Sequence, residues 1–327
     1  MLICRTPFRL SFYGGGLDYP EWYNYNKINV LNAALGYYCY QTVRELPPFF
    51  NHNYRAAYST IELANHINDI KHPSIRECIR RFAPTKNIEI THVGDLPARS
   101  GIGSSSAFTV GMINALHALS GKHIGKAELA QLAIDTEQIN MGENVGIQDQ
   151  CAAAFGGVIL TKADYNSISP RRFISQKSYL DYISDSLLMG FNGRERFSSV
   201  GSLHTSDSIR LGRNNDLLEK LSFLSDEGIK AFSSEADISL HAKITKECRD
   251  IKLHLNGDHN NDEINTLIER TERAGSLCTR IMGAGRGGFL LCWAPRIKHA
   301  DIKSSVDIKT WVDVKISNSG SEIIYYE

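Results

Sequence analysis

The sequence has no excess charge of either sign. Its 36 lysines and arginines equal its 36 aspartates and glutamates, so the formal net charge is zero. A neutral chain has no overall attraction to nucleic acid or to an anionic membrane surface. We therefore expect no nucleic-acid partner and no membrane partner, and we expect any anion to be bound by a local arrangement of residues.

Motifs built on cysteine and histidine are also missing. The chain has seven cysteines, an odd number without a CxxC pair, and its eleven histidines include neither HExxH nor HxH. These absences argue against a disulfide framework, a zinc site and a transition-metal enzyme. We expect buried thiols in the reduced state.

Long apolar runs are absent as well. No run approaches the roughly 18 apolar residues of a membrane helix, and Arg5 and Arg9 interrupt the segment in which a signal peptide would be apolar. We therefore expect a cytoplasmic location. What is present is an ordinary globular composition, with 42% hydrophobic and 22% charged residues. The 327 residues suggest about two domains, at ~150 residues per domain.

The first ordered segment that the pattern predicts is a strand over residues 3–13, where apolar and polar residues alternate. Arg9 lies on its polar face. The strand runs into three glycines at 14–16, a turn where backbone can approach a ligand closely, and Asp18 follows. Arg9 and Asp18 therefore bracket a glycine corner.

Helical patterns follow further along the chain. One helix is predicted to begin in the segment GIGSSS and to reach about Leu119, and another spans about Lys126–Met141 with Glu137 in its last turn. Between Ile61 and Phe82 we expect two short helices, interrupted at Pro73.

The remaining segments are expected to be loops and strands. Residues 44–60 are aromatic and contain two prolines, which predicts a long loop, and residues 162–182 are typical of a connection between two halves. Strands are predicted near Asn87–Val93 and over Phe289–Trp293.

The segment Leu96–Ala107 has the composition of an anion site made of backbone. Gly101 and Gly103 remove side chains, three serines supply hydroxyls, and a helix begins there with unpaired N–H groups. A glycine-serine loop with a serine cap is the alternative. No GxxxxGK[ST] motif is present, and Ser106 stands where a dinucleotide fingerprint needs its third glycine.

Three further features are weak when taken singly. The turn GAGRGG at Gly283–Gly288 needs no ligand to explain it. Asp149 lies among small apolar residues and Glu137 lies on a helix flank, so each must be paired, hydrogen-bonded or functional. Each carboxylate alone is more often structural.

The combination of these motifs, in this order, resembles the GHMP kinase superfamily. The chain has PxR and GGGxDY, then LPxxxGxGSSSA, then a helix-borne glutamate, GxQDQ and finally GAGxGGF. Within that superfamily, the GGGxDY pattern, IKHPSIRE and GIQDQCAAAFGG are similar to the D-glycero-D-manno-heptose 7-phosphate kinases. Two departures are Arg280, where a lysine is common, and Arg286, where a glycine is common.

The resemblance implies an α+β fold with two domains, at residues 1–165 and 183–327. The first would be like domain 2 of ribosomal protein S5, and the second would be ferredoxin-like. It also implies a kinase that uses ATP and Mg²⁺ in carbohydrate metabolism, on the route to GDP-activated heptose for surface polysaccharide. The alternatives are another GHMP sugar kinase, such as a fucokinase or a galactokinase-like enzyme, and a non-catalytic sugar-sensing regulator.

The resemblance further implies roles for individual residues. Asp149 would accept the proton of the sugar hydroxyl, Arg9 would neutralise charge on the transferred group, and Ser105 and Glu137 would bind Mg²⁺, with Ser106 as the neighbouring possibility. The ATP phosphates would be held by the loop residues Pro97, Arg99, Ser100, Gly101, Gly103, Ser104, Ser105 and Ser106.

The expected sugar site lies near the glycine corner and the last glycine turn. Its residues would be Gly14, Gly15, Gly16, Asp18, Arg196, Gly283, Ala284 and Gly285. Arg196 is included because a phosphorylated substrate needs a further cation. Other candidates for that cation are Arg194, Arg99 and Lys177. Phe49, Phe50 and Tyr58 would wall the adenine pocket or pack in the core.

Overall fold

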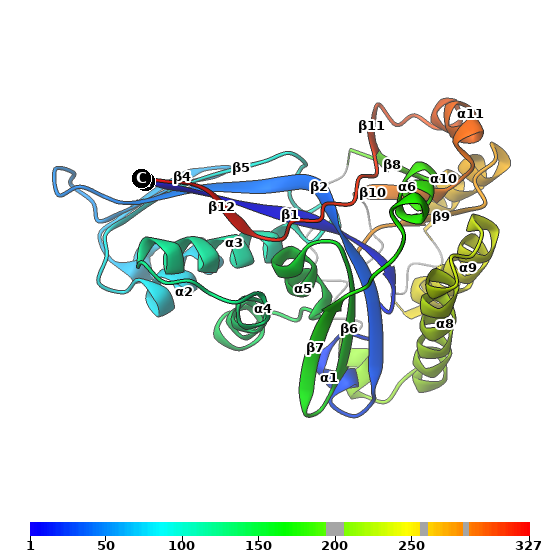
Figure 1. The fold of residues 1–327 in the computed structure, drawn as a ribbon, viewed down its shortest axis with the longest axis horizontal. Coiled ribbons are helices and arrows are strands. Elements are labelled where there is room, and N and C mark those ends of the chain that lie inside the picture. The colour runs from blue at the N-terminus through cyan, green and yellow to red at the C-terminus, as the bar shows by residue number, and fades with distance from the viewer. Residues whose placement is uncertain (194–205, 256–260, 284–287) are drawn as a thin grey trace.

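Two β-sheets with helices against them make up the protein, in a computed structural model that describes residues 1–193, 206–255, 261–283 and 288–327 (Figure 1). The described strands form a mixed eight-stranded sheet and an antiparallel four-stranded sheet. The larger sheet contains β1 (Leu2–Tyr13), β2 (Ile28–Glu45), β3 (Tyr54–Ala57), β4 (Ile61–Ala64), β5 (Ile88–Gly94), β6 (Val158–Asp164), β7 (Ser167–Arg172) and β12 (Glu322–Tyr326). The smaller sheet contains β8 (Leu187–Phe191), β9 (Cys278–Ile281), β10 (Phe289–Trp293) and β11 (Thr310–Asp313).

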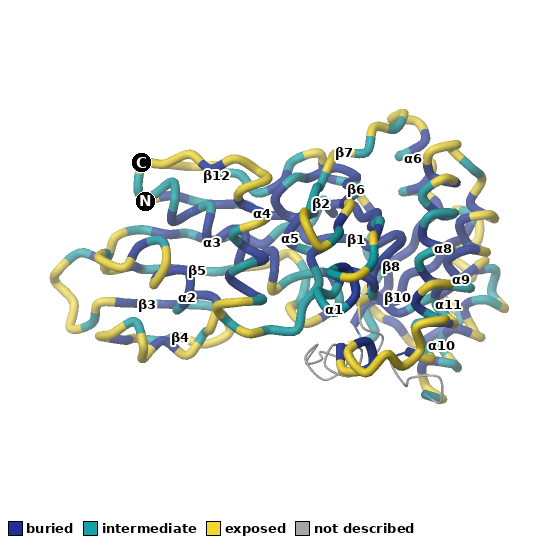
Figure 2. The backbone as a smooth tube through the Cα atoms, turned by 90° about the horizontal axis from the view of Figure 1, so that it is seen from below, coloured by how far each residue is buried: buried dark blue, intermediate teal, exposed yellow. Residues whose placement is uncertain are grey.

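The long strand β2 organises the larger sheet. Its first part pairs with β6, its last part pairs with β5, and β1 runs antiparallel to it along most of its length. The last strand of the chain, β12, returns to pair with the outer edge of β1. The two chain ends therefore lie side by side (Figure 2).

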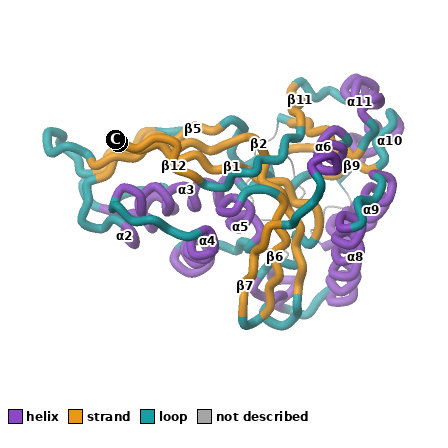
Figure 3. The backbone as a smooth tube through the Cα atoms, viewed as in Figure 1, coloured by secondary structure: helices purple, strands orange, loops and turns teal. Residues whose placement is uncertain are grey.

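Helices pack against both sheets (Figure 3). Those near the larger sheet are α1 (Pro20–Tyr23), α2 (Pro73–Phe82), α3 (Ser104–Leu119), α4 (Lys126–Asp135) and α5 (Gln148–Phe155). Those near the smaller sheet are α6 (Lys177–Asp185), α8 (Asn215–Ser233), α9 (Ile238–Leu255), α10 (Asp262–Arg273) and α11 (His299–Ser305). The chain also contains two 3-10 turns, Ile67–Asp69 and Arg296–Lys298, and a π-helical turn, Thr136–Asn140.

The main hydrophobic core lies where β1 and β2 meet α3 and α5 (Figure 2). A smaller cluster lies between the four-stranded sheet and the helices α10 and α11. All seven cysteines are buried and unbridged, which confirms the expectation of reduced thiols. No helix in the described ranges is long and apolar enough to cross a membrane.

Several sequence predictions are confirmed. The predicted strand over residues 3–13 is β1, the helix that follows GIGSSS is α3, and the strand Phe289–Trp293 is β10. The predicted helix from Lys126 is α4, which continues as the π-helical turn to Asn140. These elements have strong local patterns, so their own residues suffice to specify them.

Three predictions are wrong. Residues 44–60 contain the end of β2 and all of β3, and the first helix expected after Ile61 is the strand β4. Strands β3 and β4 form a hairpin whose stability comes from pairing with β5, a distant segment that local periodicity does not show.

The expected connection at 162–182 contains the edge strand β7 and most of α6. Pro170 fits in β7 because an edge strand has unpaired backbone on one side. The GxQDQ segment lies at the start of a helix, since Gln148 begins α5.

Candidate active site

A buried ion pair between Arg9 and Asp149 forms the centre of the site. Arg9 projects from β1, and Asp149 stands in the first turn of α5. The Nε and Nη2 atoms of Arg9 lie 2.5 Å and 3.1 Å from the two carboxylate oxygens of Asp149. The Arg9 side chain is only 8% exposed and that of Asp149 is 22% exposed. The paired fork geometry fixes both groups, and the helix N-terminus favours the negative charge of Asp149.

Arg9 also holds the glycine-serine loop. Its Nη1 donates to the carbonyl of Gly101 at 2.6 Å, and its backbone N–H donates to the carbonyl of Ile102 at 2.9 Å. A Cβ atom at Gly103 would lie 2.9 Å from Cγ of Arg9 and 3.0 Å from Oδ2 of Asp149. Glycine is therefore required at position 103, both for this approach and for its φ of +72°. The loop and the ion pair form one unit.

The start of helix α3 offers backbone donors beside this pair. Gly103 is the N-cap of α3, and no side chain caps the helix there. The first N–H groups of a helix have no partner within it, and they attract anions. The hydroxyl of Ser104 accepts from the backbone N–H of Arg99, and the hydroxyl of Ser100 donates to the carbonyl of Pro97. These two hydrogen bonds stabilise the conformation of the loop.

The described residues on either side of the last glycine turn pack against the same loop. A Cβ atom at Gly101 would lie 2.5 Å from the carbonyl oxygen of Met282, and one at Gly288 would lie 2.3 Å from that of Ser100. The N–H of Phe289 donates to the carbonyl of Ser100 at 3.1 Å. The structure thus brings Gly283, next to Met282, to the phosphate loop. Among the other residues predicted from the sequence, Ala284, Gly285, Arg286, Arg194 and Arg196 lie outside the described residues.

Glu137 is buried behind the start of α3. It stands in the π-helical turn, and its Oε2 accepts from the hydroxyl of Ser106 at 2.8 Å and from the side-chain amide of Gln150. Its Oε1 is buried without a hydrogen-bond partner in the described residues. Burial raises the pKa of Glu137 to about 7. A cation beside Oε1 would supply the missing partner and keep this carboxyl ionised.

The hydroxyl that reaches Glu137 belongs to Ser106, whereas the side chain of Ser105 is exposed. The structure therefore brings together Glu137 and the second of the two serines considered from the sequence. The donor set of carboxylate and hydroxyl oxygens suits Mg²⁺. No cluster of three or more histidine, cysteine, aspartate or glutamate side chains exists in the described chain, so phosphate oxygens and water would have to complete such a site.

Asp18 lies beside Asp149 and is almost fully buried, with 2% exposure. Its Oδ1 accepts from the N–H of Gly16 at 3.0 Å, and its Oδ2 accepts from the N–H of Gln148 at 3.2 Å. Burial and the nearby charge of Asp149 raise the pKa of Asp18. Asp18 thus ties the glycine corner to the start of α5. Its contact with the sugar stays a prediction.

The three corner glycines have different surroundings. A Cβ atom at Gly14 would lie 2.3 Å from the carbonyl oxygen of Asn29, so packing against β2 explains that glycine. At Gly15 it would meet the side chains of Ser11 and Gln148, and at Gly16 it would lie 3.7 Å from Cε of Lys252. Gly15 and Gly16 therefore face side chains that can meet a ligand.

Sequence reasoning assigned no role to the two glutamines that flank Asp149. The side-chain amide of Gln150 donates to Glu137. The side-chain amide of Gln148 donates to Asp18 at 3.3 Å, and the backbone carbonyl of Gln148 accepts a hydrogen bond from Nδ2 of Asn32 at 2.8 Å. The motif GIQDQ could have indicated these roles, because the two glutamine side chains on either side of Asp149 can each hydrogen-bond to a different neighbour.

The predicted aromatic wall is only partly assembled. Phe49 is 88% exposed and Phe50 is 50% exposed, so neither packs in the core. The ring of Tyr58 meets His72 edge-on at 4.8 Å, and His72 lies 4.8 Å from the ring of Phe108 on α3. Of the three aromatic residues, Tyr58 is the one that these ring contacts link, through His72, to helix α3.

Comparison with protein families identifies the part of the chain that contains these groups. Residues 68–157 match the model of the GHMP kinases N terminal domain, a range that includes the phosphate loop, Glu137 and Asp149. The chain carries a GHMP kinase domain. The resemblance and the enzyme class expected from the sequence, a kinase, are both confirmed.

Two curated proteins are similar to this chain over most of its length. The chain is 26% identical to D-glycero-alpha-D-manno-heptose 7-phosphate kinase of Campylobacter jejuni, over 92% of this chain and 91% of that protein. It is 24% identical to mevalonate kinase of Thermococcus onnurineus, over 72% of this chain and 69% of the other.

A solved structure has the same fold throughout. The crystal structure of a D-glycero-D-manno-heptose 1-phosphate kinase from Bacteroides thetaiotaomicron covers 100% of both chains with a TM-score of 0.78, at 19% sequence identity. This similarity confirms the α+β fold of the GHMP kinases for this chain. The domain boundaries expected from the sequence stay a prediction.

Proposed function

We propose that this kinase transfers the γ-phosphoryl group of ATP to the anomeric hydroxyl of D-glycero-D-manno-heptose 7-phosphate, giving the 1,7-bisphosphate for GDP-heptose and surface polysaccharide. The observation that carries the proposal is the Arg9–Asp149 pair, held against the glycine loop at the start of α3. The choice of sugar rests on the similarity, over nearly the whole chain, to a protein named as a heptose 7-phosphate kinase.

The phosphate loop supplies the ATP subsite in this proposal. Gly101 and Gly103 leave the backbone open, and the uncapped N–H groups of α3 attract phosphate oxygens. Arg9, already bound to the Gly101 carbonyl, lies where it can neutralise negative charge on the transferred group. Positioning and charge stabilisation are the main requirements of phosphoryl transfer.

Asp149 is placed to act on the acceptor. Its carboxylate takes the proton as the anomeric O–H bond breaks, the sugar oxygen bonds to the γ-phosphorus, and the bond from that phosphorus to ADP breaks. Arg9 orients the carboxylate of Asp149 through the paired hydrogen bonds. Asp18, buried alongside, fixes the start of α5 through Gln148.

Glu137 and Ser106 would hold Mg²⁺, because the unpartnered Oε1 of Glu137 lies buried behind the phosphate loop. The ion supplies charge neutralisation on the ATP phosphates when bound. Gln150 and Ser106 both donate to Oε2, which leaves Oε1 as the free oxygen of that carboxylate in the described structure.

An ADP-release assay over a panel of sugars, each with and without a phosphate on its last carbon, tests the proposal. We expect the heptose 7-phosphate to give the highest kcat/KM. Faster turnover of fucose or galactose would assign the chain to another sugar kinase, and absence of turnover with every sugar would favour a sugar-sensing regulator.

A further inference from the structure

A partly open pocket with a volume of about 40 Å³ lies between β1, α9, α10 and β9. Its lining comes from β1, α9, α10 and β9, with Phe12, Ile264 and Ile268 among the apolar residues and Lys252, Arg280 and Gly283 among the others. The Nη2 atom of Arg280 donates to the carbonyl of Ser11 on β1. The pocket therefore adjoins the corner that leads to Asp18 and Asp149.

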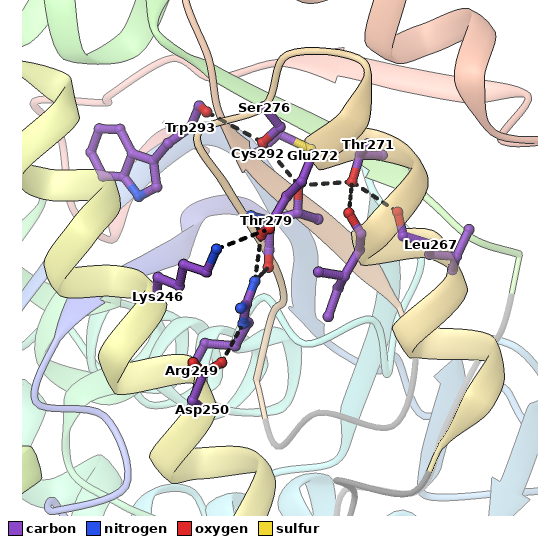
Figure 4. A network of polar contacts seen from close by, with 11 residues as sticks. Lys246, Arg249, Asp250, Leu267, Thr271, Glu272, Ser276, Thr279, Cys292 and Trp293 are labelled. Carbon is purple, nitrogen blue, oxygen red and sulfur yellow. Dashed lines mark hydrogen bonds and ion pairs between the residues drawn. The ribbon is translucent and has the colours of Figure 1, made fainter.

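A third cation in the lining, Arg249, is already fully engaged (Figure 4). Its Nη1 donates to Oε1 of Glu272 at 2.5 Å and to the carbonyl of Thr279 at 2.9 Å. Its Nε donates to Asp250 at 2.9 Å. Arg249 thus joins α9 to α10 and β9, and its charge is compensated within the protein.

Lys252 and Arg280 differ from Arg249 in this respect. Neither has a carboxylate partner among the residues that the structure describes, and the Nε of Arg280 is buried without an acceptor. Burial and then the charge of Arg280 lower the pKa of Lys252 to about 8, and burial lowers the pKa of Arg280. Two cations that repel each other in a partly buried pocket are stabilised when an anion binds between them.

The nearest charged groups of the site do not fill this role. The charge of Arg9 is matched by Asp149, and Asp18, whose charge raises the pKa of Lys252, forms no ion pair with Lys252 or Arg280 in the described residues. An anion in the pocket must therefore come from a ligand. A phosphate group offers several acceptor oxygens, which suits one ammonium and one guanidinium group.

The position of the pocket indicates which ligand supplies the phosphate. Gly15 adjoins Gln148, next to Asp149, and Gly16 adjoins Lys252, so the corner lies between the reacting carboxylate and the two cations. A sugar that spans the corner places its reacting hydroxyl at one end and its last carbon at the other. The ATP phosphates are expected at the start of α3.

We infer that Lys252 and Arg280 form the subsite that binds the distal phosphate of the sugar phosphate. This inference rests on the proposed function. It assigns to Lys252 and Arg280 the binding of the substrate's phosphate, which the sequence analysis assigned to Arg196. Arg280 was noted in the sequence only as a departure from a common lysine, and Lys252 was not singled out at all.

The first test is the variant Lys252→Gln, which removes the charge and keeps a similar length. We expect KM for the heptose 7-phosphate to rise about tenfold to a hundredfold, with KM for ATP and KM for the unphosphorylated heptose unchanged. Lys243→Gln is the matched control, since Lys243 is exposed on the same helix and lines no part of the pocket.

A variant at Arg280 supplies the second arm. Arg280→Lys keeps the charge but loses the fork, so KM for the phosphorylated sugar should rise less than in Arg280→Gln. Equal increases in KM for the phosphorylated and unphosphorylated sugars would overturn the subsite, as would an increase in KM for ATP alone.

Inorganic phosphate separates the subsite from the choice of sugar. We expect phosphate to inhibit the wild-type enzyme competitively against the sugar phosphate, and Lys252→Gln to relieve that inhibition. If a different phosphorylated sugar proves to be the substrate, the proposed function fails, while a KM effect of Lys252→Gln confined to that sugar upholds the subsite. Inhibition that is equally strong in the variant would overturn the subsite.

Discussion

Asp149 is the residue on which the proposed chemistry depends most directly, because it is the carboxylate placed to accept the proton of the sugar hydroxyl. Asn keeps the shape of the side chain and cannot act as a base. We expect Asp149→Asn to lower kcat by about 100-fold to 10,000-fold, with a normal circular dichroism spectrum and normal ATP binding. Asp181→Asn, at an exposed position on α6, is the control. If Asp149→Asn has the kcat of the wild type, Asp149 does not act as the base.

Glu137 tests the metal assignment at the same scale. In Glu137→Gln the side chain keeps its size and can still contact Ser106. The buried position of Oε1 is then occupied by a neutral amide oxygen or by an NH2 group, neither of which replaces a carboxylate oxygen as a metal ligand. We expect the Mg²⁺ concentration for half-maximal rate to rise at least several-fold, measured by titrating Mg²⁺ at fixed ATP. An unchanged titration would show that Glu137 is a structural carboxylate.

Lys252 gives a pH dependence whose sign follows from its environment. Its pKa is lowered to about 8 by burial and by Arg280, with Cys248, Asp18 and Arg9 as the other charged or titratable groups around it. The ammonium is therefore lost as the pH rises through about 8. We expect kcat/KM for the phosphorylated sugar to fall above that pH, and to fall less for the unphosphorylated sugar. In Lys252→Arg the decline should shift to higher pH, and identical profiles for the two sugars would contradict the role of Lys252.

At the scale of elements, the phosphate loop joins β1, α3 and α5 through a single glycine. Gly103→Ala places a Cβ atom against both Arg9 and Asp149 and strains a φ of +72°. Gly121→Ala is a matched control, because Gly121 has a φ of +68° at the end of α3 with nothing within 4 Å of its Cβ position. Both variants should lose about 1–3 kcal/mol of stability in denaturant melts, and only Gly103→Ala should lose turnover. Equal kcat in the two variants would contradict the close approach.

The sequence predicted those elements whose signals are local. Strand β1 has alternating residues, α3 follows a glycine-serine start, and β10 is a short apolar run after glycines. The hairpin β3–β4 could not be predicted in this way, because its pairing with β5 depends on residues far along the chain. The π-helical turn that aims Glu137 at Ser106 also has no recognisable local pattern.

At the scale of the whole molecule, the site is assembled from segments near both ends of the sequence. Arg9, the loop at Gly101 and Gly103, and Asp149, which the resemblance assigns to one site, contact one another in the structure. The contact of Arg280 with Ser11 and the approach of Lys252 to Gly16 arise only when the smaller sheet and α9 pack against the glycine corner. Such contacts between distant segments are set by tertiary packing, which sequence spacing does not reveal.

The most direct test of the central claim is the identity of the product. Wild-type enzyme is incubated with ATP, Mg²⁺ and D-glycero-D-manno-heptose 7-phosphate, and the product is examined by phosphorus NMR. The account predicts one ADP per sugar and a second phosphorus signal coupled to the anomeric proton. A new phosphate on any other carbon, or ADP release without a phosphorylated sugar product, would contradict it.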